Sequence, residues 1–314
     1  MGNESRNEIP VLITSNQTAQ LLRARFPLKI GSWRLQDSEI FSSPQLQNLC
    51  IKMVPSGHVL GSRALVVADT EKESPEHVRF LYTGDFITRK NGLIPPLTPI
   101  KCDILACECT YGMPFYEFPP IDVLRKGIID WIADSLQKGP VVLYGYALGK
   151  NQEILSLLAR FSEECTIICD EETCAIADVY RSAGIPLPAC EPYKKYSRGK
   201  FLERDSRWIL ILPLGDRFND RYQKIDAVQC RRAVFSGWTL DERWLSRWNV
   251  DAGFPLSDHA SFSELISFIE KCSPSDLIFL HGDGTILKRK LMERRANILK
   301  GHVSGDVRIH ALQV

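Results

Sequence analysis

Between Ile121 and Trp238 the chain alternates short apolar runs with amphipathic stretches, and this alternation constrains the fold more than any other feature. The runs PVVLYGY, CTIICD, WILILPL and RAVFSGW have the length and composition of buried strands. The stretches DVLRKGIIDWIADSLQKG, GKNQEILSLLARF and EETCAIADVYRSAG have the periodicity of helices that bury one face. Strands that alternate with helices in this way predict a parallel sheet flanked by helices.

The segments before and after this region have a different rhythm. The earlier part predicts strands at LCIKMV, RALVVAD, VRFLYTGDF and CDILACECTYG, and the last third predicts helix SFSELISFIEKC, strand DLIFLHG, helix ILKRKLMERRANILK and strand DVRIHAL. The rhythm changes near Pro119 and returns near Ser236. We therefore predict an α/β protein in which residues 121–235 form a domain inserted into a core made of residues 1–120 and 236–314.

Composition excludes several classes of protein. The 314 residues are 44% hydrophobic and 25% charged, as in ordinary globular proteins, and the net charge of +1 excludes a uniformly basic surface. No apolar run approaches the ~20 residues that a membrane span needs. The N-terminal residues MGNESRNEIP lack the basic and apolar parts of a secretion signal, so we expect a cytoplasmic protein.

The ten cysteines are expected to be reduced thiols, because nothing in the sequence indicates an oxidising compartment. No Cys-x-x-Cys pair occurs, and Cys107 and Cys109 are expected to pack in a core. A zinc site made of Cys165, Cys169 and Cys174 is disfavoured because these residues lack the usual ligand spacing.

Positive charge is concentrated in one part of the chain. Residues 194–247 contain 13 Lys and Arg against seven Asp and Glu, which is a local net charge of +6. Local positive charge of this kind can follow a phosphate backbone. An ordinary surface with ion pairs explains it equally well, and on charge alone that interpretation is preferred.

Histidines and a carboxylate occupy the ends of predicted strands and the start of a helix. His58 lies in the turn SGHVLGS, Asp85 follows the strand FLYTG, His259 precedes a helix in PLSDHASF, and His281 ends the strand DLIFLHG. Each residue alone is as easily explained by a cap, a turn or a core contact. Together, imidazole and carboxylate groups are the ligands that suit zinc. The adjacent residues Ser257, Asp258 and His259 do not indicate a serine hydrolase, because neighbours in sequence cannot adopt the geometry of a catalytic triad.

Seven segments in order resemble one family. SGHVLGS, YTGDF, CDILACECTYG, YALGKNQEIL, FSGW, PLSDHASF and FLHG are similar to segments of the metallo-β-lactamase-fold nucleases that carry a β-CASP insertion. The likeness extends from PVLITSNQTAQLL to FLHG and is greatest for ligase-associated DNA exonucleases and for mRNA 3′-end processing factor-like proteins. It implies an αββα metallo-β-lactamase sandwich, truncated at its N-terminus, in which residues 121–235 are the β-CASP domain.

The resemblance also implies a role for individual residues. His58 would bind one zinc ion, His281 would bind a second, and Asp85 would bridge both ions. His259 would protonate the leaving oxygen of a phosphodiester, and Glu108 would orient His259. The implied substrate is a DNA or RNA strand, hydrolysed with the help of two zinc ions, and a DNA ligase or other repair or processing proteins are possible partners.

One departure from the family pattern is important. The His-x-His-x-Asp-His signature is absent, and no histidine precedes His58. Two explanations remain open: a reading frame that begins at an internal methionine, or a degenerate paralogue that binds nucleic acid or a partner without cutting it. In either case we expect this chain to bind zinc weakly and to hydrolyse its substrate inefficiently, since too few protein ligands remain for each ion.

Three functions follow from these observations. The first is a metal-dependent nuclease, and the second is a catalytically inactive nucleic-acid-binding or scaffold subunit. A third, hydrolysis of a small thioester or lactam, is disfavoured by the inserted domain with its basic flank. The sequence distinguishes neither DNA from RNA as substrate nor exonuclease from endonuclease activity.

Overall fold

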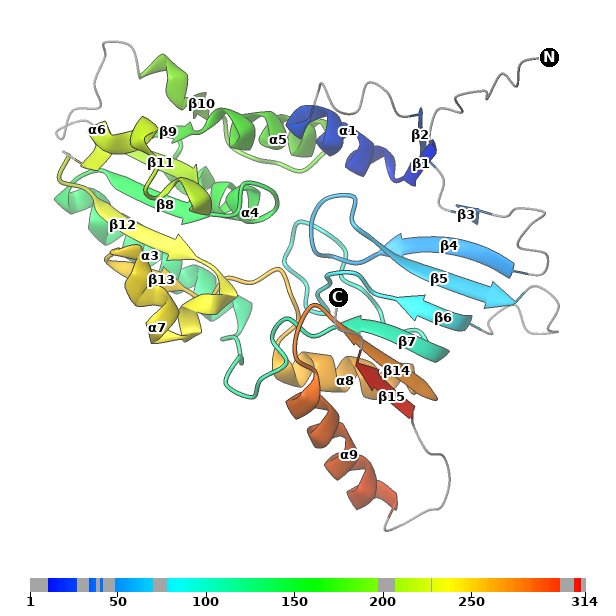
Figure 1. The fold of residues 1–314 in the computed structure, drawn as a ribbon. Coiled ribbons are helices and arrows are strands. Elements are labelled where there is room, and N and C mark those ends of the chain that lie inside the picture. The colour runs from blue at the N-terminus through cyan, green and yellow to red at the C-terminus, as the bar shows by residue number, and fades with distance from the viewer. Residues whose placement is uncertain are drawn as a thin grey trace, which may run out of the picture.

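The computed structural model describes residues 11–26, 34–37, 40–41, 49–69, 78–196, 207–226, 228–299 and 308–311. Two large β-sheets dominate this part of the chain, and they lie side by side with their helices around them (Figure 1). A separate small parallel pair joins β1 (Val11–Thr14) to β2 (Arg34–Asp37). The α/β class expected from the sequence is confirmed.

The first large sheet has seven strands in the order β15-β14-β7-β6-β5-β4-β3. Its strands are β3 (Ile40–Phe41), β4 (Leu49–Pro55), β5 (Arg63–Asp69), β6 (Val78–Tyr82), β7 (Cys102–Glu108), β14 (Asp276–Leu280) and β15 (Arg308–Ala311). Strands β3 to β6 pair antiparallel, and β6, β7, β14 and β15 pair parallel. Because β4 and β6 are both antiparallel to β5, the C-terminal ends of β4, β6, β7 and β14 meet at one edge of the sheet.

The second large sheet has six strands in the order β10-β9-β11-β8-β12-β13, all paired in parallel. Its strands are β8 (Val141–Gly145), β9 (Thr166–Cys169), β10 (Glu191–Pro192), β11 (Trp208–Pro213), β12 (Arg231–Phe235) and β13 (Ala252–Phe254). The parallel sheet expected from the alternating pattern is therefore confirmed. From β8 the chain continues to β9, toward the β10 edge of the sheet, and from β12 it continues to β13, at the opposite edge. A crevice therefore opens between the C-terminal ends of the neighbouring strands β8 and β12.

The principal helices agree with the amphipathic stretches of the sequence. They are α1 (Asn16–Arg25), α3 (Ile121–Lys138), α4 (Lys150–Leu157), α5 (Glu171–Ser182), α8 (Phe262–Cys272) and α9 (Thr285–Leu299), and short helices α6 (Gln223–Asp226) and α7 (Glu242–Leu245) join them. Helix α5 begins at an N-cap formed by Asp170. Helix α8 begins at a capping box between Ser261 and Glu264.

Alternate residues of β8 show how the second sheet is covered on both faces. Val141 and Leu143 belong to the core that α3, α4 and α5 form with one face. Val142 and Tyr144 belong to the core on the other face, with residues such as Trp208 and Leu210. The buried apolar residues of the seven-stranded sheet form a separate core, in which β7 and β14 pack against α8 and α9.

Some elements differ from the expectations or were not expected. The strand predicted over 78–86 ends at Tyr82, because Thr83 to Phe86 form the turn that presents Asp85. Strand β13 pairs with β12, so the six-stranded sheet continues beyond residue 235, and the division at 235/236 stays a prediction. Within the described ranges, no helix combines the length and the apolarity that crossing a membrane requires.

Candidate active site

His58 and Asp85 lie together at the edge where the strands of the seven-stranded sheet end. His58 follows β4 and Asp85 follows β6, and an isolated antiparallel bridge between Gly57 and Phe86 joins the two turns. Gly57 has a φ of 81°, and a Cβ at this position would lie 2.9 Å from the Cα of Pro96. This close turn places Nε2 of His58 3.6 Å from Oδ2 of Asp85.

His259 reaches the same place from the loop that precedes α8. Its ring centroid lies 4.7 Å from that of His58. The backbone carbonyl of Asp258 is 3.1 Å from Nδ1 of His58, so Nδ1 carries the proton and Nε2 faces Asp85. Arg89 holds the loop: its guanidinium donates to the backbone carbonyls of Ser257 and His259 and forms an ion pair with Glu264.

Glu108 is a buried partner of His259. It ends β7, it is 1% exposed, and its Oε1 lies 3.0 Å from Nδ1 of His259. The same carboxylate accepts hydrogen bonds from the backbone N–H groups of Phe86 and Thr110. Burial by itself would raise the pKa of Glu108, but the charge and the hydrogen bond of His259 outweigh it and the pKa is lowered.

The pKa of His259 is shifted in the opposite direction. Burial by itself would lower it, but the charge and the hydrogen bond of Glu108 raise it to about 9. Since Nδ1 is engaged by Glu108, Nε2 is the ring atom of His259 that is free to act on another group.

The donor atoms of His58, Asp85 and His259 all lie within 4.8 Å of one another. Two imidazoles and one carboxylate make the set of three protein ligands that is typical of a catalytic zinc ion. These residues therefore fit one metal ion. Among the described residues no further His, Cys, Asp or Glu joins this group, so the donors for a second ion are not assembled here.

The fifth residue singled out from the sequence, His281, is placed differently. It follows β14 at the same edge of the sheet, next in the chain to Leu280, which pairs with Glu108. Its φ is 56° and its side chain is exposed. The structure thus brings together His58, Asp85, Glu108 and His259, while His281 stays outside the group.

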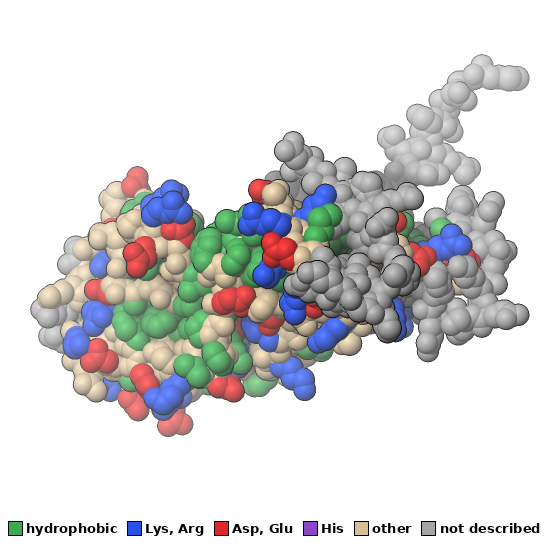
Figure 2. Space-filling view, turned by 90° about the horizontal axis from the view of Figure 1, so that it is seen from below, with side chains coloured by type: hydrophobic (Ala, Val, Ile, Leu, Met, Phe, Trp, Pro, Cys, Tyr) green, Lys and Arg blue, Asp and Glu red, His purple; other side chains and the backbone are tan. Residues whose placement is uncertain are grey.

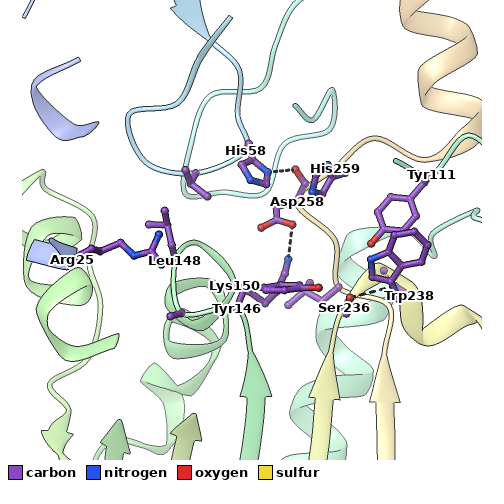
Figure 3. A pocket seen from close by; sticks show the side chains of 14 residues that line it. Arg25, His58, Tyr111, Tyr146, Leu148, Lys150, Ser236, Trp238, Asp258 and His259 are labelled. Atoms are coloured by element: carbon purple, nitrogen blue, oxygen red, sulfur yellow. Dashed lines mark hydrogen bonds and ion pairs between the residues drawn. The ribbon is translucent and has the colours of Figure 1, made fainter. Parts of the chain in front are cut away.

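A pocket of about 320 Å³ lies beside this group (Figure 3). Its other wall comes from the six-stranded sheet, where Tyr146 and Lys150 follow β8, and Ser236 and Trp238 follow β12. These residues line the crevice between the ends of β8 and β12, where the connections of the sheet diverge. Open parallel sheets commonly bind ligands at such a crevice. The pocket is also lined by Arg25, Val59, Tyr111, Ala147, Leu148, Gly237, Leu256 and Asp258, together with His58 and His259.

A buried cation connects the two walls of the pocket. Lys150 is 1% exposed, and its ammonium group lies 3.2 Å from Glu153 and 3.7 Å from Asp258 (Figure 3). Burial by itself would raise the pKa of Asp258, but Lys150, and then His58 and His259, hold it below its usual range. The carboxylate beside both imidazoles therefore stays ionised.

The sequence did not single out Lys150, Asp258 or Tyr111 as site residues. Lys150 begins a helix directly after a strand, which is an ordinary place for a solvated lysine, and its burial results from packing between the sheets. The rejection of a catalytic triad agrees with the structure, since the Ser257 hydroxyl bonds the backbone of His259 and not its ring.

Comparisons with known proteins identify relatives of this chain. A probable DNA ligase of Opitutus terrae is 31% identical over 286 residues, which are 90% of this chain and 26% of the ligase. A protein from the lig 3′ region of Acidianus ambivalens is 32% identical over 136 residues, 43% of this chain and 89% of that protein. An RNase J-like protein of Methanocaldococcus jannaschii is 31% identical over 120 residues, 37% of this chain and 27% of that protein.

The chain belongs to the β-CASP family of metallo-β-lactamase-fold nucleases. No protein-family model matches it. The crystal structure of a protein of unknown function from Enterococcus faecalis V583 has the same fold, with a TM-score of 0.54 and 14% identity over 98% of this chain and 74% of that one. This β-CASP chain spans only about a quarter of the length of the Opitutus and Methanocaldococcus relatives.

The basic stretch of this β-CASP chain is largely paired with carboxylates. Six arginines of the stretch lie within ion-pair distance of an Asp or Glu, namely Arg207, Arg217, Arg221, Arg231, Arg232 and Arg243. Figure 2 shows positive and negative side chains interspersed on one face of the molecule. Residues 197–206 of the predicted basic stretch lie outside the described residues. Where the structure describes it, the stretch is an ordinary ion-paired surface.

Proposed function

We propose that this chain hydrolyses phosphodiester bonds of a nucleic-acid strand with the help of a divalent metal ion. The observation that carries the proposal is the convergence of His58, Asp85 and His259 from three separate segments. His58 and His259 of this group also line the pocket. We further propose that the seven-stranded sheet belongs to a metallo-β-lactamase sandwich and that the six-stranded sheet is the β-CASP insertion. The cytoplasmic location stays a prediction.

In this proposal His58 and Asp85 hold the metal ion, and His259 acts on the leaving oxygen. When bound, the ion would supply Lewis-acid polarisation of a phosphoryl oxygen. Glu108 keeps Nδ1–H of His259 oriented and its charge favours the protonated ring, so that Nε2–H can donate a proton to the oxygen that leaves. Lys150 keeps Asp258 ionised beside both rings and so holds the loop of His259 in place.

The same donor set limits the activity that we expect. His58 and Asp85 supply two ligands, and the third within reach is Nε2 of His259. That nitrogen cannot bind a metal ion and donate a proton at the same time. We therefore expect one weakly bound zinc or manganese ion and slow hydrolysis. His281, expected to hold a second ion, would need its exposed side chain to turn toward Asp85.

The lining of the pocket favours a strand with unstacked bases. Tyr111, Tyr146 and Trp238 offer aromatic faces on which bases can stack, and Arg25 offers positive charge to a phosphate. The relatives include proteins named as a probable DNA ligase and as RNase J-like. We propose DNA or RNA as the substrate, and a DNA ligase or other repair or processing proteins as partners.

A second candidate function is a nucleic-acid-binding or scaffold subunit without catalysis. The donor set favours it, because only His58 and Asp85 are left to bind a metal ion if His259 acts on the leaving oxygen. In that case the pocket would bind a strand and leave it intact.

The experiment is a cleavage assay with a fluorescent single-stranded DNA and the RNA of the same sequence, in Mn²⁺, in Zn²⁺ and in excess chelator. We expect slow, metal-dependent cleavage that is lost in His259→Ala. Binding of the oligonucleotides without cleavage would favour the scaffold function. Cleavage that is unchanged in His259→Ala would exclude this site.

A further inference from the structure

Three cysteine side chains meet at one end of α5, away from the pocket. Cys169 ends β9 and is fully buried, Cys174 lies in the first turn of α5, and Cys190 directly precedes β10. Their sulfur atoms all lie within 4.8 Å of one another, and those of Cys174 and Cys190 are 3.6 Å apart. The sequence disfavoured a zinc site of Cys165, Cys169 and Cys174, and in the fold Cys190, not Cys165, joins the other two.

The spacing of the sulfur atoms matches what a thiophilic metal ion requires. Zinc binds a thiolate at ~2.3 Å, so two thiolates on one tetrahedral ion lie roughly 3.8 Å apart. The Cys174–Cys190 separation of 3.6 Å is close to this value, and small rotations about the side-chain bonds can bring Cys169 to it.

A positive group and a helix N-terminus lie beside the sulfur atoms. The guanidinium of Arg181 lies 3.5 Å from Sγ of Cys190, and the N-terminus of α5 lies beside Cys174. Three thiolates and one divalent ion carry a net charge of −1, which Arg181 balances.

We propose that Cys169, Cys174 and Cys190 form a binding site for one thiophilic d¹⁰ metal ion, Zn²⁺ or Cu⁺, with Arg181 as its counter-charge. Among the described residues no fourth His, Cys, Asp or Glu belongs to the group, so the ion keeps an open position or is three-coordinate. A bound ion would link β9, α5 and the edge strand β10, because each supplies or adjoins one of the three cysteines. It is independent of the proposed nuclease function.

The position of α5 gives this site a structural consequence. Helix α5 packs along α1, and Glu172 forms an ion pair with Arg25 of the pocket wall (Figure 1). Further along α5, the hydroxyl of Tyr180 accepts a hydrogen bond from the backbone N–H of Leu60, two residues after His58. An ion at the N-terminus of α5 would therefore stabilise the helix that contacts both α1 and the turn after His58.

The test is titration of the reduced, metal-free protein with Co²⁺ in the absence of oxygen. One equivalent should produce near-ultraviolet thiolate-to-cobalt absorption, which the oxygen and nitrogen donors of His58, Asp85 and His259 cannot produce. One equivalent of Zn²⁺ or of Cu⁺ should remove it. Cys174→Ser and Cys190→Ser should each abolish the band.

Cys165→Ser is the matched control, because Cys165 is buried just before β9 and lies outside the group. It should keep the band. Circular dichroism checks that each variant is folded. Zn²⁺ should raise the melting temperature of the wild type by more than that of Cys190→Ser, in which only the site of His58, Asp85 and His259 remains. No band in the wild type, a band that persists in both serine variants, or a Cys174–Cys190 disulfide in the protein as isolated would overturn the proposal.

Discussion

The ammonium group of Lys150 lies 3.7 Å from Oδ1 of Asp258, and this ion pair joins the six-stranded sheet to the loop that carries His259. Both groups are buried, and Lys150 also pairs with Glu153, which in turn pairs with Arg125. The geometry of the candidate site therefore depends on charges that water does not screen.

Lys150→Met tests this dependence. The substitution leaves the buried carboxylate of Asp258 without its cation, and it leaves Glu153 with Arg125 alone. We expect it to lower the free energy of unfolding by about 3–5 kcal/mol. Urea unfolding followed by tryptophan fluorescence measures the change. Lys126→Met is the matched control, since Lys126 forms an exposed ion pair with Asp130 and its loss should have little effect. Equal effects of the two substitutions would contradict a stabilising role of the buried ion pairs of Lys150.

Glu108→Gln tests the origin of the raised pKa of His259. The carboxylate is what raises this pKa to about 9, so its removal should bring the pKa back toward or below ~6.5. NMR titration of the histidine resonances in metal-free protein measures it. Glu117→Gln, at an exposed carboxylate that bonds Ser263, should leave it unchanged.

The same pair predicts the pH dependence of stability in the metal-free protein. The pKa of His259 is higher in the folded than in the unfolded state, so the folded state binds more protons between about pH 6.5 and 9. The stability from this pair is thus fully present below about pH 6.5 and is lost as the pH rises through 9. The melting temperature should fall over this interval, and it should fall less in Glu108→Gln. A steeper fall in the variant would be inconsistent with the assignment.

Gly57→Ala tests the turn that positions His58. Gly57 and Gly184 both have left-handed φ angles, 81° and 86°, so alanine strains the backbone similarly at both positions. Only at Gly57 would the added Cβ meet atoms of Ile87 and Pro96 at 2.9 Å. We expect Gly57→Ala to destabilise the fold by at least ~1 kcal/mol more than Gly184→Ala in urea unfolding. A smaller or reversed difference would show that the close packing of this turn is not required.

Much of this fold follows directly from the sequence. The alternation of strands and helices predicts the parallel six-stranded sheet, and the positions of His58 and Asp85 after β-rich runs predict that they lie at a sheet edge. Local patterns carry this information because strand ends and glycine turns are encoded by neighbouring residues.

Other parts could not be predicted because they depend on distant contacts. The burial of Lys150 needs Asp258, which is 108 positions away, and the thiol group needs Cys190, 21 positions after Cys169. The two-residue strand β10 and the three-residue strand β13 are too short to show a period, and pairing with their neighbours alone defines them. Such contacts become visible only when the sheets are assembled.

Trp238→Ala tests the aromatic wall of the pocket. Trp238 lines the pocket, and its ring centroid lies 5.0 Å from that of Tyr111. A base that enters the pocket can stack on the Trp238 ring. Loss of one stacking partner should weaken binding of single-stranded DNA by roughly tenfold. Fluorescence anisotropy measures the affinity, and Trp244→Ala, outside the pocket lining, should bind like the wild type. Unchanged affinity in Trp238→Ala would exclude the pocket as the path of the strand.

X-ray diffraction at the zinc absorption edge, from crystals soaked in Zn²⁺, tests the central claim most directly. We predict one anomalous peak in the pocket, at ~2.0–2.2 Å from Nε2 of His58 and from a carboxylate oxygen of Asp85. The peak should be missing in crystals of His58→Ala. Two peaks at this place about 3.5–4 Å apart, or no peak within reach of these side chains, would contradict the account.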